Sequence, residues 1–280
     1  MKIGLVTDST GYVSMEDVEK HNIEVIPLKI IYPDGQIFDE SALNWKEYFS
    51  FLKTAKKLPT TSQPSAGEFE NIYSAMFDKG YEEILSIHIS AGLSGTVQSA
   101  LMSRDTFQDK KIEVYDSFYT AMALGFQVVE AANLIKENAS IPDILACLDY
   151  MRNNTKLLFM VDTLEYLHKG GRIGGAQALL GSILQLKPIL TVFKKVETYD
   201  KVRTRQKALA RLVEEMEKEV QKAKGRFKLG VLHLEAPDTA KYLEEKLKVL
   251  SPDISMSVLG PCVGTHVGPG TVGVCITHLP

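Results

Sequence analysis

The chain has 280 residues, of which 45% are hydrophobic and 24% are charged, and its formal net charge is −3. That length suits two modest domains, and the composition is that of a globular protein rather than a disordered or fibrous one. The near-neutral charge supplies no strong positive field to hold nucleic acid by its phosphates, so we expect no nucleic-acid partner.

Short apolar runs alternate with amphipathic stretches through the first half of the chain. The pattern predicts strands over 3–7, 24–27, 84–89, 112–115 and 157–161. Their interiors are apolar almost without alternation, which is typical of strands buried on both faces of a parallel sheet. Helices are expected between them, over 14–20, 45–55, 66–79, 94–103, 119–136 and 142–153. This alternation predicts an α/β fold.

The second half of the chain has a different pattern. Segments 187–192 and 196–199 predict a hairpin, and a long amphipathic helix is expected over 204–223. Strand, helix and strand follow over 228–234, 239–250 and 254–259, and a last strand is expected over 272–277. We therefore predict an N-terminal α/β domain with a mostly parallel sheet, residues 1–160, and a smaller C-terminal α/β domain, residues 161–280.

Three acidic residues, Asp8, Asp116 and Asp162, each follow an apolar run and precede a helix or turn. Ligands of open α/β sheets tend to bind at such strand ends, and three carboxylates there could hold Mg²⁺. They could equally cap the following turns by accepting backbone N–H bonds. Their spacing matches no specific metal motif, and we expect no metal site.

The loop 90–96, Ser-Ala-Gly-Leu-Ser-Gly-Thr, joins an expected strand to an expected helix. Free amides and the helix dipole at such a position suit a carboxylate or a phosphate. We expect Ser94 at or near the N-cap, with Gly92 and Gly95 allowing close approach of a ligand. A tight turn before a capped helix is the simpler interpretation, and the loop lacks the Gly-Lys-Ser/Thr of a P-loop.

Hydroxyl side chains also gather over 60–65, Thr-Thr-Ser-Gln-Pro-Ser. Ser65, with Glu68 three residues later, predicts a capping box at the start of a helix. That leaves Thr61 and Ser62 to point into a cleft, unless the segment is only a polar linker.

Two glycine-rich segments surround an arginine and a histidine. Arg172 lies among four glycines over 169–175, where it could meet an anion or an acidic partner while the loop acts as a hinge. His266 lies among glycines and threonines over 264–273, and we interpret it as a site residue. Gly268 to Gly273 matches G-x-G-x-x-G, but no helix follows, so we reject a dinucleotide site.

Four motifs in this order resemble the DegV family. They are Thr-Ser-Gln-Pro-Ser (61–65), Ser-x-x-Leu-Ser-Gly-Thr (90–96), Gly-Gly-Arg (170–172) and Thr-His-x-Gly-Pro-Gly-Thr (265–271). The opening Thr-Asp-Ser-Thr (7–10) is similar as well. The resemblance covers nearly the whole chain.

The resemblance implies a DegV-type fold of two domains with a long-chain fatty acid bound between them. It also implies that the protein is not itself an enzyme and uses no cofactor. Members of the family include the subunits that carry a fatty acid to a separate ATP-dependent kinase subunit, where the carboxylate is phosphorylated for phospholipid synthesis.

Site residues follow from the same resemblance. It places Thr61 and Ser94 on the carboxylate, with His266 supporting them. Supporting or kinase-docking roles fall to five further residues, namely Ser62, Arg172, Arg203, Arg205 and Thr265. We expect the acyl tunnel to be lined by Phe118, Leu164, Leu167, Ile173, Leu179, Leu180 and Ile183.

Two other functions remain open from the sequence. An acyl hydrolase or transferase could use Ser94 as the nucleophile with His266 as its base, although no G-x-S-x-G motif surrounds Ser94. A lipid-sensing regulatory protein could bind its partner through the face that carries Arg203 and Arg205.

The sequence also bears on the compartment. Three widely spaced cysteines and the absence of CxxC and HExxH motifs favour neither a disulfide framework nor a structural zinc site. An early Asp8 argues against a signal peptide, and Gln185, Lys187 and Pro188 interrupt the most apolar stretch. We expect a cytoplasmic protein, and the resemblance leaves room for transient membrane contact.

Overall fold

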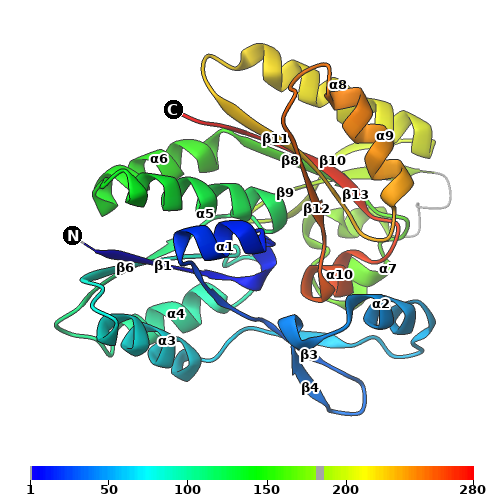
Figure 1. Cartoon of the computed structure of the whole chain (residues 1–280). Coiled ribbons are helices and arrows are strands. Elements are labelled where there is room, and N and C mark those ends of the chain that lie inside the picture. The colour runs from blue at the N-terminus through cyan, green and yellow to red at the C-terminus, as the bar shows by residue number, and fades with distance from the viewer. Residues whose placement is uncertain (1, 181–185) are drawn as a thin grey trace.

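A computed structural model describes residues 2–180 and 186–280, which form three sheets with helices around and between them (Figure 1). The first sheet is parallel, in the order β2-β1-β6-β7. Its strands are β1 (Ile3–Asp8), β2 (Glu24–Ile26), β6 (Glu83–His88) and β7 (Lys111–Asp116). The α/β class and the parallel sheet expected for the N-terminal half are confirmed.

Helices cover both faces of this parallel sheet. One face packs on α3 (Ala66–Asp78) and α4 (Thr96–Arg104), and the other on α5 (Ala121–Lys136). Both β1 and β6 are consequently buried along their whole length, which explains their continuous apolar runs. The predicted capping box is present at α3, where Ser65 and Glu68 bond to each other's backbone N–H groups.

The second sheet has six strands in the order β10-β9-β8-β13-β11-β12. Its strands are β8 (Thr155–Met160), β9 (Lys187–Phe193), β10 (Lys195–Val202), β11 (Phe227–His233), β12 (Ile254–Val258) and β13 (Val272–His278). The predicted hairpin is confirmed as β9–β10. Placing 157–161 in a parallel sheet was wrong, because β8 runs antiparallel to both neighbours. Both of its faces are buried all the same, because its side chains belong alternately to two hydrophobic cores, and its apolar run therefore resembles that of a parallel strand.

This strand also bears on the expected domain boundary. β8 lies before residue 160, yet it pairs with β9 and β13 from the second half of the chain. The helix α5 contacts strands of both large sheets. The division into residues 1–160 and 161–280 stays a prediction.

A third, small sheet was not predicted. It is antiparallel, in the order β4-β3-β5, with β3 (Lys29–Ile31), β4 (Ile37–Asp39) and β5 (Thr60–Ser62). Strands of three residues are too short to show a period in the sequence. The polar segment around Thr61 is therefore a strand, with Thr61 opposite Ile30.

The remaining helices complete the layers. α8 (Arg205–Lys222) and α9 (Pro237–Leu247) cover the outer face of the six-stranded sheet, and α6 (Ile141–Asn153) packs on α5. The shorter helices are α1 (Met15–His21), α2 (Trp45–Thr54), α7 (Glu165–Lys169) and α10 (Pro261–Val267), with 3-10 turns at Ser9–Gly11, Glu40–Ala42 and Gly174–Leu179. Among the described residues, no helix is both long and apolar enough to cross a membrane.

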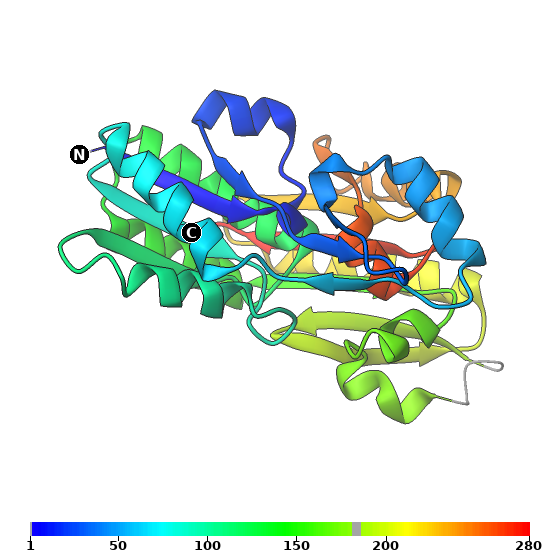
Figure 2. The same cartoon turned by 90° about the horizontal axis from the view of Figure 1, so that it is seen from below.

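The turn of the β9–β10 hairpin meets the loops of the parallel sheet, as the view from below shows (Figure 2). Lys194 donates its N–H to the Phe118 carbonyl at 2.8 Å. The Ser90 hydroxyl donates to the Lys194 carbonyl at 2.7 Å. These two bonds fix the hairpin against the loops that follow β6 and β7.

Candidate functional site

A pocket lies where the carboxyl end of the parallel sheet meets the six-stranded sheet and α10. The loop after β6 lines the pocket, and β6 lies beside β1 where the strand order reverses, the usual ligand position in such sheets. Most of the wall is apolar and includes Leu157, Phe159, Leu167, Val192, Val196 and Leu232.

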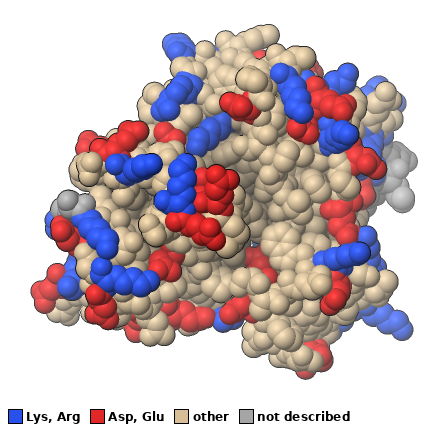
Figure 3. Space-filling view, viewed as in Figure 1, with Lys and Arg blue, Asp and Glu red and all other residues tan. Residues whose placement is uncertain are grey.

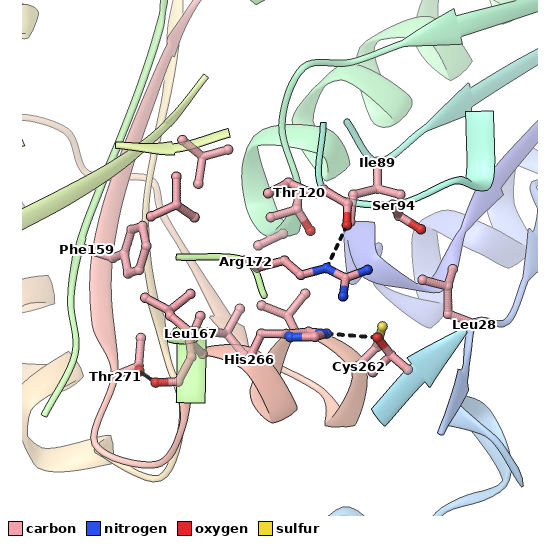
Figure 4. Close-up of a pocket in the computed structure, with 18 of the residues that line it drawn as sticks. Leu28, Ile89, Ser94, Thr120, Phe159, Leu167, Arg172, Cys262, His266 and Thr271 are labelled. Carbon is pink, nitrogen blue, oxygen red and sulfur yellow. Dashed lines mark hydrogen bonds between the residues drawn. The ribbon is translucent and has the colours of Figure 1, made fainter. Parts of the chain in front are cut away.

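Four of the polar side chains that line this pocket come from four separate segments, and three of them, Ser94, Arg172 and His266, are labelled in Figure 4. Thr61 lies on β5, Ser94 precedes α4, Arg172 follows α7, and His266 lies on α10. The structure therefore brings together three residues expected on the carboxylate and one expected only in a supporting or docking role.

Thr61 and His266 are joined by a hydrogen bond of 2.8 Å between Oγ1 and Nε2. The histidine ring fits because residue 170 is glycine, since a Cβ there would lie 2.2 Å from Nδ1. That Nδ1 atom is buried and has no hydrogen-bond partner among the described residues. The Gly-Gly-Arg motif thus makes room for the histidine of a distant motif.

Burial, with a smaller contribution from the positive charge of Arg172, lowers the pKa of His266 to about 3. The imidazole is therefore neutral at physiological pH and carries one proton. When Nε2 carries the proton and donates to Thr61 Oγ1, the Thr61 hydroxyl is free to donate its own proton to an acceptor on a ligand. In the other tautomer the Thr61 proton is used in the bond to Nε2.

Ser94 lies in the loop directly before Gly95, the N-cap residue of α4, which agrees with the expected position at or near the N-cap. The Ser94 hydroxyl instead bonds to the Thr96 hydroxyl at 2.9 Å. Gly92 and Gly95 lie close to other parts of the protein chain, where we had expected them to allow the approach of a ligand. A Cβ at Gly92 would lie 2.4 Å from the Lys194 carbonyl oxygen, and one at Gly95 would lie 2.9 Å from the Gln63 amide.

Arg172 spans the pocket wall with two bonds to backbone carbonyls. Its Nε donates to Leu93 at 3.1 Å, and its Nη1 donates to Gly170 at 2.9 Å. No carboxylate of the described residues pairs with it, and part of its guanidinium is left without a partner there. A planar cation in this state is suited to bind a carboxylate or another oxyanion.

The helix α10 is held by Glu40, which the sequence gave no reason to single out. Its carboxylate is 1% exposed and accepts from the Cys262 N–H at 2.8 Å, from Ser9 and from Tyr12. The Tyr12 hydroxyl in turn accepts from the Val263 N–H at 3.3 Å. Burial raises the pKa of Glu40 in spite of these donors.

The other expected site residues lie away from the pocket lining. Ser62 donates its hydroxyl to the Gln63 carbonyl, and the buried Thr265 bonds to Tyr48 and to the Pro261 carbonyl. Arg203 is exposed. Arg205 pairs with Asp162 at 2.7 Å and belongs to the six-stranded half of the molecule.

The three strand-end aspartates do not converge. Asp8 accepts from the N–H groups of Thr10 and Ile89, and Asp116 accepts from those of Ala91 and Phe118. Asp162 makes the ion pair with Arg205. The first two therefore shape the turns after β1, β6 and β7, as the capping interpretation expects. The described residues contain no group of three or more side chains that could hold a metal ion.

Several pocket residues escaped the sequence analysis. Leu28, Gln63, Thr120 and Cys262 line the pocket, and only Gln63 lies within a motif that the sequence singles out. Of the expected tunnel set, Leu167 lines this pocket, and Ile183 lies outside the described residues. The others do not belong to its lining, namely Phe118, Leu164, Ile173, Leu179 and Leu180.

The outer face seen in Figure 3 carries acidic and basic side chains interspersed around a hollow. A second cleft lies on this side, between α1 and β12, and is lined in part by Ser14, Asp17, Ser255 and Met256. It is more open and more polar than the pocket that contains Thr61 and Ser94.

Comparison with known proteins gives consistent matches over the whole chain. A family model described as an uncharacterised protein of the DegV family matches residues 2–279. The protein DegV of Bacillus subtilis (strain 168) is 37% identical over 279 residues, which cover 98% of this chain and 99% of that protein.

Solved structures resemble this one over their full length. A fatty-acid-binding DegV family protein from Thermus thermophilus matches with a TM-score of 0.92 and 33% identity, covering 100% of both chains. DegV from Bacillus subtilis, described as a fatty acid binding protein, matches with a TM-score of 0.89 and 37% identity over 99% of each chain. A DegV lipid-binding protein from Thermotoga maritima matches with a TM-score of 0.85 and 28% identity, covering 99% of this chain and 98% of that one.

The depressed pKa of His266 predicts a pH dependence of stability. The folded protein binds fewer protons at this residue than the unfolded chain between pH 6.5 and about 3, so its contribution to stability is lost as the pH falls through that window. Urea unfolding of the ligand-free protein should show a larger loss between pH 7 and pH 5 for the wild type than for His266→Gln. Equal losses in the two proteins would contradict a neutral, buried His266.

Proposed function

Because the chain belongs to the DegV family, we propose that it binds a long-chain fatty acid, with the carboxylate at Thr61, Ser94, Arg172 and His266 and the acyl chain in the apolar part of the pocket. One observation carries this proposal. A guanidinium without an acidic partner among the described residues faces a pocket whose remaining wall is mostly apolar. Arg172 is partly buried, and a ligand with an anionic head and an apolar tail would supply both a counter-ion for it and an apolar surface for the wall.

The acyl chain accounts for the affinity. Each CH₂ group transferred from water to an apolar wall contributes ~0.8 kcal/mol, so a chain of about fifteen carbons gains on the order of ten kcal/mol before the costs of binding. The hydroxyls of Thr61 and Ser94 and the guanidinium of Arg172 then fix which end of the chain lies near the loops. A carboxylate accepts several hydrogen bonds, and these three groups can supply them.

We further propose that the bound carboxylate is presented to a separate ATP-using kinase subunit, which phosphorylates it to an acyl phosphate. The chain contains no Gly-Lys-Ser/Thr of a P-loop to hold the nucleotide's phosphates. The carboxylate end of the pocket is formed by half-exposed residues, Thr61 and Ser94 among them, so a partner protein can reach it. The protein would then act as the ligand-binding subunit of a two-part enzyme.

Hydrolysis with Ser94 as the nucleophile is less well supported by the geometry. The imidazole of His266 bonds to Thr61, while Ser94 bonds to Thr96. A catalytic triad also needs an acid on the second ring nitrogen, and Nδ1 of His266 has no partner in the described part of the chain.

The proposal predicts that the purified protein carries a lipid. Extraction with organic solvent and mass spectrometry should detect a long-chain fatty acid at close to one molecule per protein, because the apolar pocket holds such a chain against dilution. A protein that yields no lipid, and that takes up neither added hexadecanoate nor added oleate, would refute fatty-acid binding.

The carboxylate contacts predict the effect of two substitutions. Thr61→Val and Ser94→Ala should each weaken the binding of a fluorescent fatty acid by ~1–3 kcal/mol, because each removes a hydrogen bond to a charged group. Ser62→Ala is the matched control, since Ser62 adjoins Thr61 but does not line the pocket, and its hydroxyl bonds to the Gln63 carbonyl. Unchanged affinity in both pocket variants would contradict the proposed position of the carboxylate at this end of the pocket.

If Arg203 contributes to docking of the kinase subunit, its substitution should affect the phosphorylation reaction and not the binding of the fatty acid. This side chain is exposed and has no ion-pair partner within the described ranges. Arg203→Ala should leave fatty-acid affinity unchanged and slow acyl phosphate formation in an assay reconstituted with a kinase subunit.

A control for this variant lies at the opposite end of the same helix. Lys224→Ala removes an exposed charge about 27 Å away, beyond the 18 residues of α8, and should not slow the reaction. Equal rates for wild type, Arg203→Ala and Lys224→Ala would exclude Arg203 from docking. Lipid binding without acyl phosphate formation in any protein would favour a lipid-sensing regulatory role.

A further inference from the structure

The hydroxyl of Thr120 is buried in the pocket wall without a partner. Thr120 is 7% exposed and lines the pocket, and its Oγ1 has no hydrogen-bond partner among the described residues. The other hydroxyls of the lining all have one. Thr61 bonds to His266, Ser94 bonds to Thr96, and Thr271 donates to the Gly268 carbonyl. Buried hydroxyls are normally satisfied, so the exception requires an explanation.

The helix that follows does not use this hydroxyl either. Thr120 is the N-cap residue of α5, where a threonine side chain normally accepts a backbone N–H of the first turn. That bond is missing here. The next residue, Ala121, has a left-handed backbone with φ of 52°, which costs free energy for any residue other than glycine. The backbone is thus held in a strained conformation in which the hydroxyl faces the pocket rather than the helix.

Thr120 lies close to the carboxylate end of the pocket. Ser90 donates its N–H to the Tyr119 carbonyl at 2.8 Å, which joins the Thr120 turn to the loop that carries Ser94. In Figure 4, Thr120 lies between the polar end, with Ser94, and the apolar end, with Phe159. A chain whose carboxylate is held at Ser94 would therefore pass Thr120 with one of its first carbons.

We propose that Thr120 is a polar subsite for an oxygen substituent on the acyl chain at C2 or C3, where C1 is the carboxylate carbon. The ligand class is then a long-chain 2-hydroxy or 3-hydroxy fatty acid. This inference rests on the proposed fatty-acid function. A threonine hydroxyl can donate and accept, so it pairs with a ligand hydroxyl in either direction. With an unsubstituted chain, the same hydroxyl stays buried against methylene groups and opposes binding.

A cycle of residue and ligand changes tests this subsite. Dissociation constants for hexadecanoate, 2-hydroxyhexadecanoate and 3-hydroxyhexadecanoate are measured with wild type, Thr120→Val and Thr120→Ser. Valine has the shape of threonine without its hydroxyl, and serine keeps the hydroxyl. The wild type should prefer at least one of the hydroxy acids over hexadecanoate by about tenfold, as expected for one net hydrogen bond. The serine variant should keep this preference, and the valine variant should lose it.

The outcomes separate this inference from the function on which it rests. The same preference in Thr120→Val as in wild type, or no preference in either, would overturn the subsite. An equal loss of all three ligands in the valine variant would assign the hydroxyl to the carboxylate instead and also overturn it. If the wild type bound none of the three ligands, fatty-acid binding itself would fail. Thr120→Ala provides a second variant without the hydroxyl if the valine variant does not fold.

Discussion

The buried carboxylate of Glu40 joins the pieces of chain that build the pocket. It accepts hydrogen bonds from the turn after β1, through Ser9 and Tyr12, and from the first turn of α10, through Cys262. Glu40 itself follows the small sheet that carries Thr61. A buried carboxylate without its donors is strongly unfavourable, so these three segments are held in one arrangement. The position of His266 opposite Thr61 depends on it, because α10 carries the histidine.

Glycines allow segments from different motifs to lie close together in the site. Gly170 makes room for the His266 ring, and Gly95 makes room for the Gln63 amide. The strands around them supply rigid walls, because β8 and β13 lie in the middle of the six-stranded sheet with helices on both sides. The polar end of the pocket is therefore built from loops and short elements, whereas the apolar end is built mainly from strands.

The sequence predicted most long elements and the identity of the polar cluster, and it failed where contacts decide the outcome. The α/β class, the capping box at Ser65 and the β9–β10 hairpin are local patterns and were found. The direction of β8 was not, because burial on both faces gives the same apolar run in either orientation. No local sequence pattern marks Glu40 or Thr120. The role of Glu40 comes from hydrogen-bond partners that are distant in the chain. Thr120 stands out only because its hydroxyl has no partner among the described residues.

Two of the buried polar atoms that have no partner among the described residues lie at this pocket. Both Nδ1 of His266 and Oγ1 of Thr120 are buried without partners in the described part of the chain, and Arg172 has no carboxylate beside it there. The two buried atoms lower the stability of the ligand-free fold, because a buried polar group without a partner loses its bonds to water. A ligand with an anionic head and an oxygen near it would satisfy the arginine and the threonine together. The same groups that destabilise the empty pocket would then determine which acyl chains bind, since a chain lacking either oxygen leaves one of them unpaired.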